Sequence, residues 1–188
     1  MIRFDHVTFG YALQRPILRD FSLTVPEDGR VCLTGPSGEG KTTALRLLLG
    51  LERPRKGTVS VPEGVRFSAV FQEDRLLPWK TVLENAALFS DEDSACRVLT
   101  ALGLGDSLDA LPETLSGGMK RRAALARALA HPFDVLVLDE ALTGLDDAAK
   151  ACCLAAIDRA VGPHKTLVMA CHDPAEAAAL AARTVPVA

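Results

Sequence analysis

Residues 35–42 read Gly-Pro-Ser-Gly-Glu-Gly-Lys-Thr, a spacing of glycine, any four residues, Gly-Lys and then Ser or Thr that binds phosphate in many proteins. The glycines let the backbone curl so that successive N–H groups point at one anion, and the helix that follows adds its positive end. Lys41 would then reach the outer phosphates, and the hydroxyl of Thr42 would ligate Mg²⁺. The alternative, a glycine-rich turn with a chance lysine, is disfavoured because this loop lies between an apolar strand and a helix.

Two carboxylates follow the most apolar strand candidate of the chain. Residues 135–138 read Val-Leu-Val-Leu, as expected for a strand buried on both faces, and Asp139 and Glu140 come directly after it. Asp139 would lie beside the phosphate loop and hold magnesium through water, and Glu140 would polarise the attacking water, a role worth about 10²–10⁴ in rate. A carboxylate after a strand is by itself more often a helix cap, but the phosphate loop upstream favours catalysis.

A third motif precedes a helical segment. Residues 115–119 read Leu-Ser-Gly-Gly-Met, and a helix is predicted from Lys120 onward. Serine and glycine in front of a helix present a hydroxyl and free N–H groups at its positive end, which makes a second anion site. Taken alone, this motif would be interpreted as an ordinary helix cap.

Together these motifs resemble those of the ATP-binding cassette ATPases, over residues 11–172. That family carries the phosphate loop, the sequence LSGGQ, the apolar Asp-Glu strand and a switch histidine in this order. The resemblance implies that Gln72 contacts Mg²⁺ and the attacking water, that His172 contacts the γ-phosphate, and that Tyr11 stacks on adenine. Without it, Gln72 and His172 would be ordinary polar residues at strand ends, and Tyr11 a packing residue. The implied ATP-binding set is Tyr11, Gly35, Pro36, Ser37, Gly38, Glu39, Gly40, Lys41, Thr42, Thr43, Ser116, Gly117, Gly118 and Asp146.

This sequence departs from the family pattern at two positions. Met119 stands where the signature usually has glutamine, which leaves open the polar contact that glutamine makes, while the phosphate-facing serine and glycines remain. Methionine is frequent there in the nitrate/sulfonate/taurine branch of importers, so the departure indicates a branch. Ala141 replaces the proline that usually follows the catalytic glutamate, which leaves open how rigid this loop is.

Residues 71–79, Phe-Gln-Glu-Asp-Arg-Leu-Leu-Pro-Trp, closely resemble the corresponding loop of importers for nitrate, sulfonates and taurine. The resemblance implies that the segment from Gln72 to Trp79 contacts a membrane permease, with Leu76, Leu77 and Trp79 lining a groove for it. Ordinary packing of these side chains between helices and sheet is the alternative.

The order of elements predicts the fold class. Strands are expected at residues 2–9, 17–25, 31–33, 65–71, 135–138 and 166–171, and helices at 43–49, within 81–111, at 120–130, at 148–160 and from Pro174. Strands separated by helices indicate an α/β fold with a mainly parallel sheet. The resemblance adds a P-loop NTPase core with an N-terminal antiparallel part, in a single domain of residues 1–188 with a helical subdomain at about 73–130. One face of the helix at 120–130 is interpreted as solvated, with the aliphatic parts of its basic side chains covering the core. Its residues are Lys120, Arg121, Arg122 and Arg127.

Composition narrows the class of protein. The 188 residues suit one globular domain, and 21 basic against 24 acidic residues give a net charge of −3, which disfavours a nucleic-acid partner. No segment approaches the roughly 20 apolar residues of a membrane span, and the first residues do not resemble a signal peptide. The five cysteines form no CxxC pair, and we expect them to be small buried residues in a reducing cytosol.

The function implied by the resemblance is that of the ATP-hydrolysing subunit of a transporter. Two chains would form a head-to-tail dimer that binds two ATP with Mg²⁺. The dimer would drive uptake of a small solute through a permease on the inner face of the cell membrane, served indirectly by a solute-binding protein. One alternative is a soluble ABC-type ATPase of DNA repair or translation, although the coiled-coil, zinc or basic insertions usual there are missing from this sequence. A degenerate, regulatory subunit is disfavoured because Lys41, Asp139, Glu140 and His172 are all present.

Overall fold

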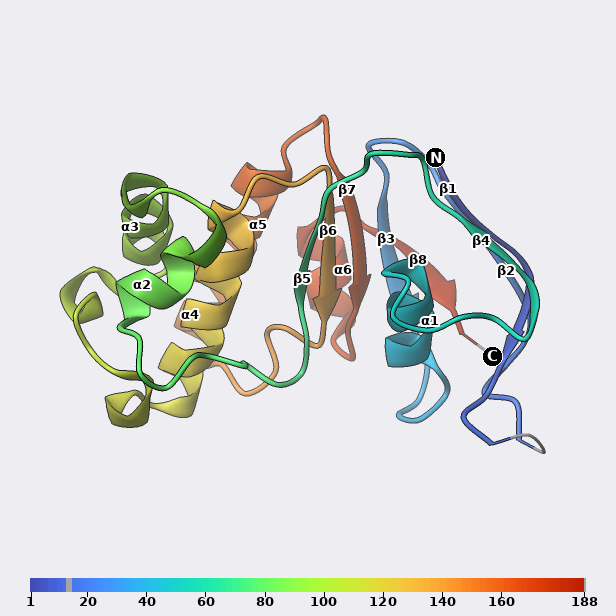
Figure 1. Ribbon diagram of the computed structural model, residues 1–188, viewed down its shortest axis with the longest axis horizontal. Helices are drawn as coiled ribbons and strands as arrows, with labels where there is room; N and C mark the ends of the chain where they lie inside the picture. Colours follow the sequence, from blue (N-terminus) through green and yellow to red (C-terminus); the bar gives the residue numbers. More distant parts are fainter. Residues whose placement is uncertain (13–14, 188) are drawn as a thin grey trace.

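A central parallel sheet organises the molecule, as the computed structural model shows for residues 1–12 and 15–187 (Figure 1). Its five strands lie in the order β5-β6-β7-β3-β8, and every neighbouring pair is parallel. The strands are β3 (Arg30–Thr34), β5 (Phe67–Val70), β6 (Val135–Asp139), β7 (Thr166–Ala170) and β8 (Arg183–Pro186). Because all five run the same way, their carboxyl ends meet at one edge, the lower edge in Figure 1.

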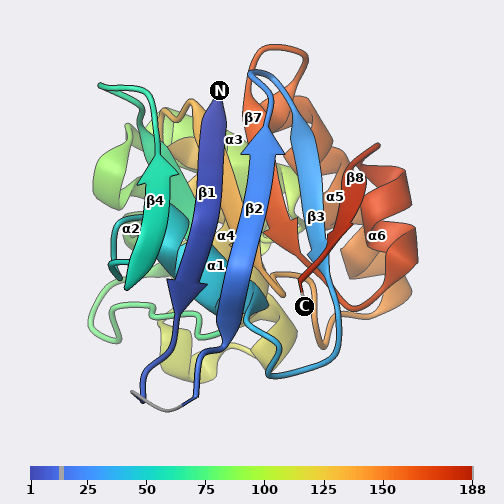
Figure 2. The same cartoon turned by 90° about the vertical axis from the view of Figure 1, so that its right-hand side faces the viewer.

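An antiparallel sheet of three strands forms a second layer (Figure 2). It consists of β1 (Ile2–Phe9), β2 (Leu18–Val25) and β4 (Lys56–Ser60), in the order β2-β1-β4. Buried and more exposed residues largely alternate along β1 and β2, so one face of each strand is buried and the other is more open to solvent.

The helices divide between the two faces of the parallel sheet. Helix α1 (Lys41–Leu48) lies between the two sheets, while α4 (Gly117–Ala130), α5 (Asp147–Val161) and α6 (Pro174–Ala179) lie on the other face. Helices α2 (Val82–Ala86) and α3 (Glu92–Ala101) pack against α4, and short 3₁₀ turns occupy Ala87–Phe89, Gly105–Ser107 and Pro112–Thr114.

Strand β6 shows why the parallel sheet needs apolar residues on both faces. Val135 and Val137 belong to the hydrophobic cluster shared with α1 and the antiparallel sheet, whereas Leu136 and Leu138 belong to the cluster under α4 and α5. All four side chains are buried. The unbroken apolar run therefore marks a central strand, which places Asp139 at its carboxyl end.

The predicted α/β fold with a mainly parallel sheet is confirmed, but two strands were missed. The prediction did not contain β4, which exposes Lys56, Gly57 and Thr58 and has no clear alternation. It also ended on a helix from Pro174, whereas β8 follows that helix as an edge strand that is largely exposed. Each strand pairs with one neighbour and packs a single apolar side chain against the core, Val59 from β4 and Val185 from β8.

Burial tests the expectation for the cysteines. Cys32, Cys153 and Cys171 are buried as expected, but Cys96 and Cys152 are only half-buried, so the expectation is wrong for those two. Within residues 1–12 and 15–187, no helix combines the length and the apolar character that crossing a membrane requires.

Candidate active site

The residues predicted to do chemistry gather at the carboxyl edge of the parallel sheet. The phosphate loop follows β3, Asp139 and Glu140 stand at the end of β6, and His172 comes two residues after β7. A cavity of about 430 Å³ opens there. It is lined by Tyr11, Ile17, Ser37, Gly38, Gly40, Lys41, Thr42, Thr43, Arg46, Gln72 and Glu140. In size it matches the pockets that hold small ligands.

Tight packing shapes the phosphate loop. Gly40, the residue before α1, has a φ of 103°, and a Cβ there would lie 2.8 Å from Ile17 Cγ2. Only glycine satisfies both constraints. The Lys41 ammonium donates hydrogen bonds to the carbonyl oxygens of Gly35 at 2.7 Å and Pro36 at 3.0 Å. Since an ammonium has three N–H donors, one is left for an anion in the cavity.

Thr42 and Asp139 meet where the phosphate loop faces β6. The hydroxyl of Thr42 donates to Asp139 Oδ1 at 3.0 Å, although the two residues are far apart in sequence. Asp139 is buried, and this burial raises the pKa of its carboxyl because it disfavours the charged form. A hydroxyl and a buried carboxylate that share one hydrogen bond are the hard oxygen ligands that Mg²⁺ prefers, beside waters and phosphate oxygens. The residues present therefore fit Mg²⁺.

Gln72 connects this pair to the larger cavity. It lines the 430 Å³ cavity together with Glu140, and it also lines an adjoining cavity of about 150 Å³ together with Thr42 and Asp139. Arg46 lines both cavities as well and was missed by the sequence analysis. Its position, one helical turn after Thr42 on α1, could have indicated it, because residues four apart share a helix face.

Glu140 and His172 form a direct pair. Glu140 Oε1 lies 2.7 Å from His172 Nε2, so the imidazole donates a hydrogen bond to the carboxylate. The backbone at Glu140 has a φ of 51°, in the left-handed region, and its N–H donates to the carbonyl of Ala170 at 2.9 Å. A non-glycine residue held in this conformation costs about 1–3 kcal/mol and is commonly found at active sites.

The second predicted anion site lies outside this cavity. Ser116 precedes α4, and its hydroxyl accepts a hydrogen bond from the N–H of Met119 at 3.2 Å. Asp146 likewise accepts from Ala149 at 2.8 Å at the start of α5. In this chain both side chains are helix caps, and neither Gly117 nor Gly118 lines the cavity. The phosphate loop and the start of α4 lie on the same lower side of the molecule but apart from each other (Figure 1).

The arginines of α4 correct one expectation. Arg121 donates to the carbonyl oxygens of Phe71 at 2.9 Å and Gln72 at 2.6 Å, and its side chain is only 12% exposed. It also pairs with Asp74 Oδ1 at 3.1 Å, an ion pair without a well-directed hydrogen bond. Arg127 donates to the carbonyl oxygens of Asp74 at 3.0 Å and Arg75 at 2.8 Å.

These arginines therefore hold another segment of the chain by hydrogen bonds to its backbone, and the prediction of a solvated basic face is wrong for them. Arg122, the third, donates to the carbonyl of Leu102 at 2.8 Å. Burial lowers the pKa of Arg127. Apart from a 3.4 Å hydrogen bond from Arg122 to the carbonyl of Gly118, their carbonyl partners lie about twenty or about fifty residues upstream, so no local pattern could have indicated them. As a result, the helix that begins with the Ser-Gly-Gly motif also holds the backbone of the loop that carries Gln72.

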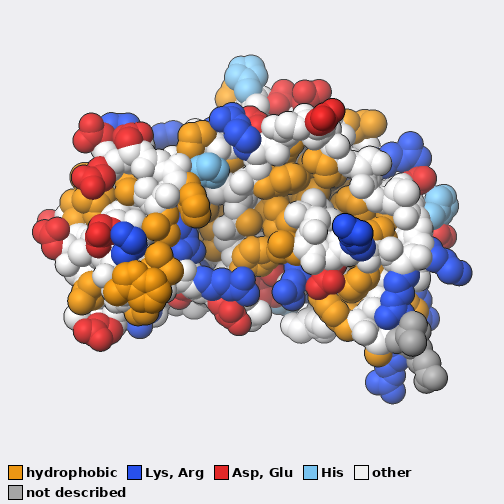
Figure 3. All heavy atoms as spheres, in the orientation of Figure 1, with side chains coloured by type: hydrophobic (Ala, Val, Ile, Leu, Met, Phe, Trp, Pro, Cys, Tyr) orange, Lys and Arg blue, Asp and Glu red, His pale blue; other side chains and the backbone are white. Residues whose placement is uncertain are grey.

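Two aromatic residues expected to bind partners are exposed. Tyr11 is 56% exposed, and its ring stands edge-on to Phe9 with centroids 5.1 Å apart. Trp79 is 71% exposed. Figure 3 shows apolar side chains at the surface over the helices. Leu76, in contrast, packs against the hydrophobic core, as the packing alternative expected.

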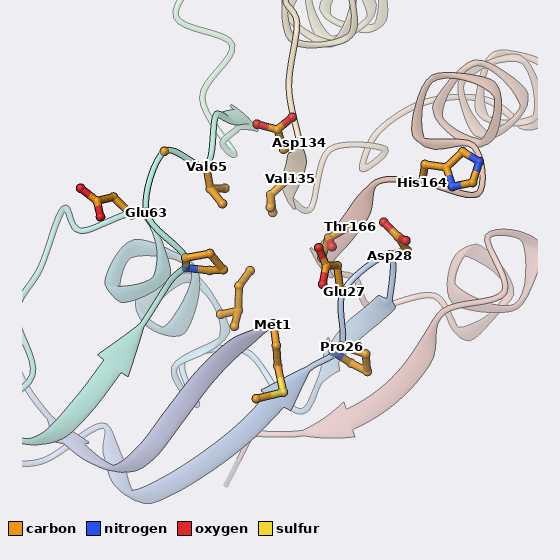
Figure 4. A pocket seen from close by; sticks show the side chains of 13 residues that line it. Met1, Pro26, Glu27, Asp28, Glu63, Val65, Asp134, Val135, His164 and Thr166 are labelled. Carbon is orange, nitrogen blue, oxygen red and sulfur yellow. The ribbon is translucent and has the colours of Figure 1, made fainter.

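A second large cavity lies at the opposite edge of the sheet (Figure 4). It measures about 400 Å³ and is lined in part by Val135 and Thr166, the first residues of β6 and β7. Glu27, Asp28 and Glu63 give it an acidic character, which is unsuited to phosphate, while Asp134 is paired with Arg66. The predicted chemistry therefore belongs to the carboxyl edge.

The chain is similar to known proteins over most of its length. A family model described as ABC transporter matches residues 18–143, which is more than half of the chain. Aliphatic sulfonates import ATP-binding protein SsuB 1 of Paracoccus denitrificans (strain Pd 1222) is 42% identical over 176 residues, covering 90% of this chain and 72% of that protein. The protein of the same name from Rhodococcus jostii (strain RHA1) is 37% identical, covering 98% of this chain and 79% of its own length. A dimeric bacterial ABC transporter cassette of known structure matches with a TM-score of 0.88 and 26% identity, covering 100% of this chain and 94% of its own.

Proposed function

Because this chain belongs to the ABC transporter family, we propose that it binds and hydrolyses ATP as the energy-supplying subunit of an importer. The observation that carries this proposal is that Thr42–Asp139 and Glu140–His172 come together as two hydrogen-bonded pairs beside the phosphate loop. Two relatives of about 40% identity are named as import subunits for aliphatic sulfonates. We therefore propose a small organic anion of that class as the solute.

Each group in the cavity has a distinct task in hydrolysis. Backbone N–H groups of the phosphate loop and the Lys41 ammonium would hold the phosphates, and Thr42, Gln72 and Asp139 would hold Mg²⁺. When bound, this cation neutralises charge on the phosphate oxygens. Glu140 accepts the proton of the attacking water, and His172 orients the Glu140 carboxylate through their 2.7 Å hydrogen bond. The exposed ring of Tyr11 stacks on the adenine.

A second copy of the chain completes the site in this proposal. Ser116, Gly117 and Gly118 present a hydroxyl and N–H groups at the positive end of α4, yet they lie away from this chain's own cavity. A two-fold, head-to-tail dimer would bring them to the ATP of the other copy, with Asp146 at the interface. The dimeric cassette that resembles this chain supports such an assembly.

The surface around Trp79 is proposed to bind the permease, which would hold the protein at the inner face of the membrane. The segment from Gln72 to Trp79 begins in the cavity and ends at an exposed indole ring. Arg121 and Arg127 fix its backbone to α4. Contact with a permease would therefore be transmitted both to Gln72 and to the helix that carries Ser116.

Trp79→Ala is expected to weaken binding of the permease about thirtyfold, because a central aromatic anchor contributes about 2 kcal/mol or more to an interface. ATP hydrolysis by the isolated chain should stay within about twofold, because the exposed side chain lies outside the cavity. The measurement is capture of membrane proteins from detergent-solubilised membranes by the tagged chain, with mass spectrometric identification.

Leu111→Ala is the control for this experiment, because Leu111 is another exposed apolar residue of the helical part. It should capture the same multi-span protein as the original chain. Recovery of soluble repair or translation factors in place of a multi-span protein would contradict the transporter assignment.

A further inference from the structure

Lys150 joins two elements that each carry a proposed site residue. It lies in the second turn of α5, and its ammonium is 3.3 Å from Glu176 Oε1 and 3.4 Å from Asp173 Oδ2. Its side chain is 26% exposed and that of Glu176 only 8%. Because it is both half-buried and bound to two carboxylates, this contact is more firmly held than a typical surface ion pair.

One end of this contact is the start of α5. The backbone N–H of Lys150 donates to the carbonyl of Asp146 at 2.8 Å, and the Asp146 side chain caps the same helix. Asp146 is the residue proposed to stand at the interface with the second copy. Any displacement of the first turn of α5 is therefore passed directly to Lys150.

The other end is the segment that carries His172. Asp173 follows this histidine directly, and its two carboxylate oxygens have separate partners: Oδ1 accepts the N–H of Ala175 at 2.9 Å, and Oδ2 faces Lys150. Glu176 lies one helical turn further on. Lys150 therefore holds the short helix α6 from one side, while the hydrogen bond to Glu140 holds His172 from the other.

We propose that Lys150 is a positioning residue that fixes His172 against Glu140 and couples this pair to the start of α5. The proposal rests on the proposed ATPase function. Its physical basis is that a single cation neutralises two carboxylates, one of them buried, immediately after the histidine. Burial raises the pKa of Glu176, which shows how poorly that site accommodates an unpaired charge.

Lys150→Met removes the charge and keeps an unbranched apolar side chain. We expect kcat for ATP hydrolysis to fall by between about tenfold and a hundredfold, because misplacing a catalytic group by about 1 Å can cost this much. KM for ATP should change by less than about twofold, because Lys150 does not line the cavity. Lys150→Arg should restore most of kcat, because a guanidinium can also bridge two carboxylates.

A purely structural role is tested by a double variant. In Lys150→Met the buried Glu176 has lost its cation, which can destabilise the fold, whereas Lys150→Met with Glu176→Gln removes that unpaired charge. We expect the double variant to regain thermal stability while kcat stays low, since Asp173 still lacks its ion pair with residue 150. If kcat recovers together with stability, the positioning role is overturned.

Lys165→Met is the matched control. Lys165 is also partly buried, and it donates to the carbonyl of Ala160 at 2.8 Å and lies over the Phe133 ring, at the opposite edge of the sheet. The kcat of Lys165→Met should equal that of the original chain. Normal kcat in folded Lys150→Met overturns this inference alone, whereas an original chain that does not hydrolyse ATP overturns the proposed function.

Discussion

Replacing Glu140 by glutamine is expected to lower the rate of ATP hydrolysis about a hundredfold or more, because general-base catalysis contributes about 10²–10⁴ in rate. Glutamine has the same shape and can still accept the hydrogen bond from His172, but it does not take a proton from water. ATP binding should be retained, since in the proposed site the phosphate loop and Lys41 hold the phosphates. Phosphate release at saturating ATP and binding of a fluorescent ATP analogue measure the two quantities separately.

The control for this variant is Glu63→Gln, an exposed glutamate that lines the cavity at the other edge of the sheet. It should hydrolyse ATP at the original rate. Hydrolysis by Glu140→Gln within a few-fold of that rate would exclude Glu140 as the base and direct attention to another group on the cavity wall.

Lys41→Ala is expected to have the largest effect on ATP binding. A charge-assisted hydrogen bond contributes about 1.5–3 kcal/mol, so affinity should fall between about tenfold and a hundredfold. Loss of an electrostatic clamp on the transferred phosphoryl group should lower kcat by about 10²–10³ in addition. The combined result is a decrease in kcat/KM of about 10³ or more, measured by steady-state kinetics over a wide range of ATP concentrations.

Lys56→Ala provides the comparison for that variant, because Lys56 is an exposed lysine on the edge strand β4. Thermal unfolding should accompany both measurements, since Lys41 is buried and holds the carbonyls of Gly35 and Pro36. A Lys41→Ala protein that is folded and binds ATP with unchanged affinity would contradict the assigned role.

The placement of the candidate catalytic groups at one edge could be predicted from the sequence. Residues 135–138 are apolar without a break because β6 is buried on both faces, and a strand of that kind must be central in a parallel sheet. The carboxyl ends of such strands meet at one edge, so Asp139, Glu140 and the phosphate loop after β3 could be expected to lie together. The 3.0 Å contact between Thr42 and Asp139 agrees with that expectation.

Contacts between distant segments could not be predicted in the same way. Arg121 and Arg127 bind carbonyl oxygens, which every residue has, so no sequence pattern distinguishes the loop they hold from any other loop. The same holds for Lys150, whose two carboxylate partners lie beyond the next strand. Strand β8 was not predicted because it is a short edge strand with one apolar side chain, Val185, packed against the core, and backbone pairing is independent of side-chain type.

The central claim is that ATP is held between the phosphate loop of one copy and the Ser-Gly-Gly motif of another. The mass of the Glu140→Gln protein in solution tests this claim most directly. With Mg²⁺ and ATP, light scattering should report twice the mass of the chain, because bound ATP is not hydrolysed and keeps the two copies together. Adding Ser116→Arg should return the mass to that of one chain while ATP remains bound, since Ser116 lies outside the chain's own cavity. A Glu140→Gln protein that binds ATP and keeps the mass of a single chain would contradict the claim.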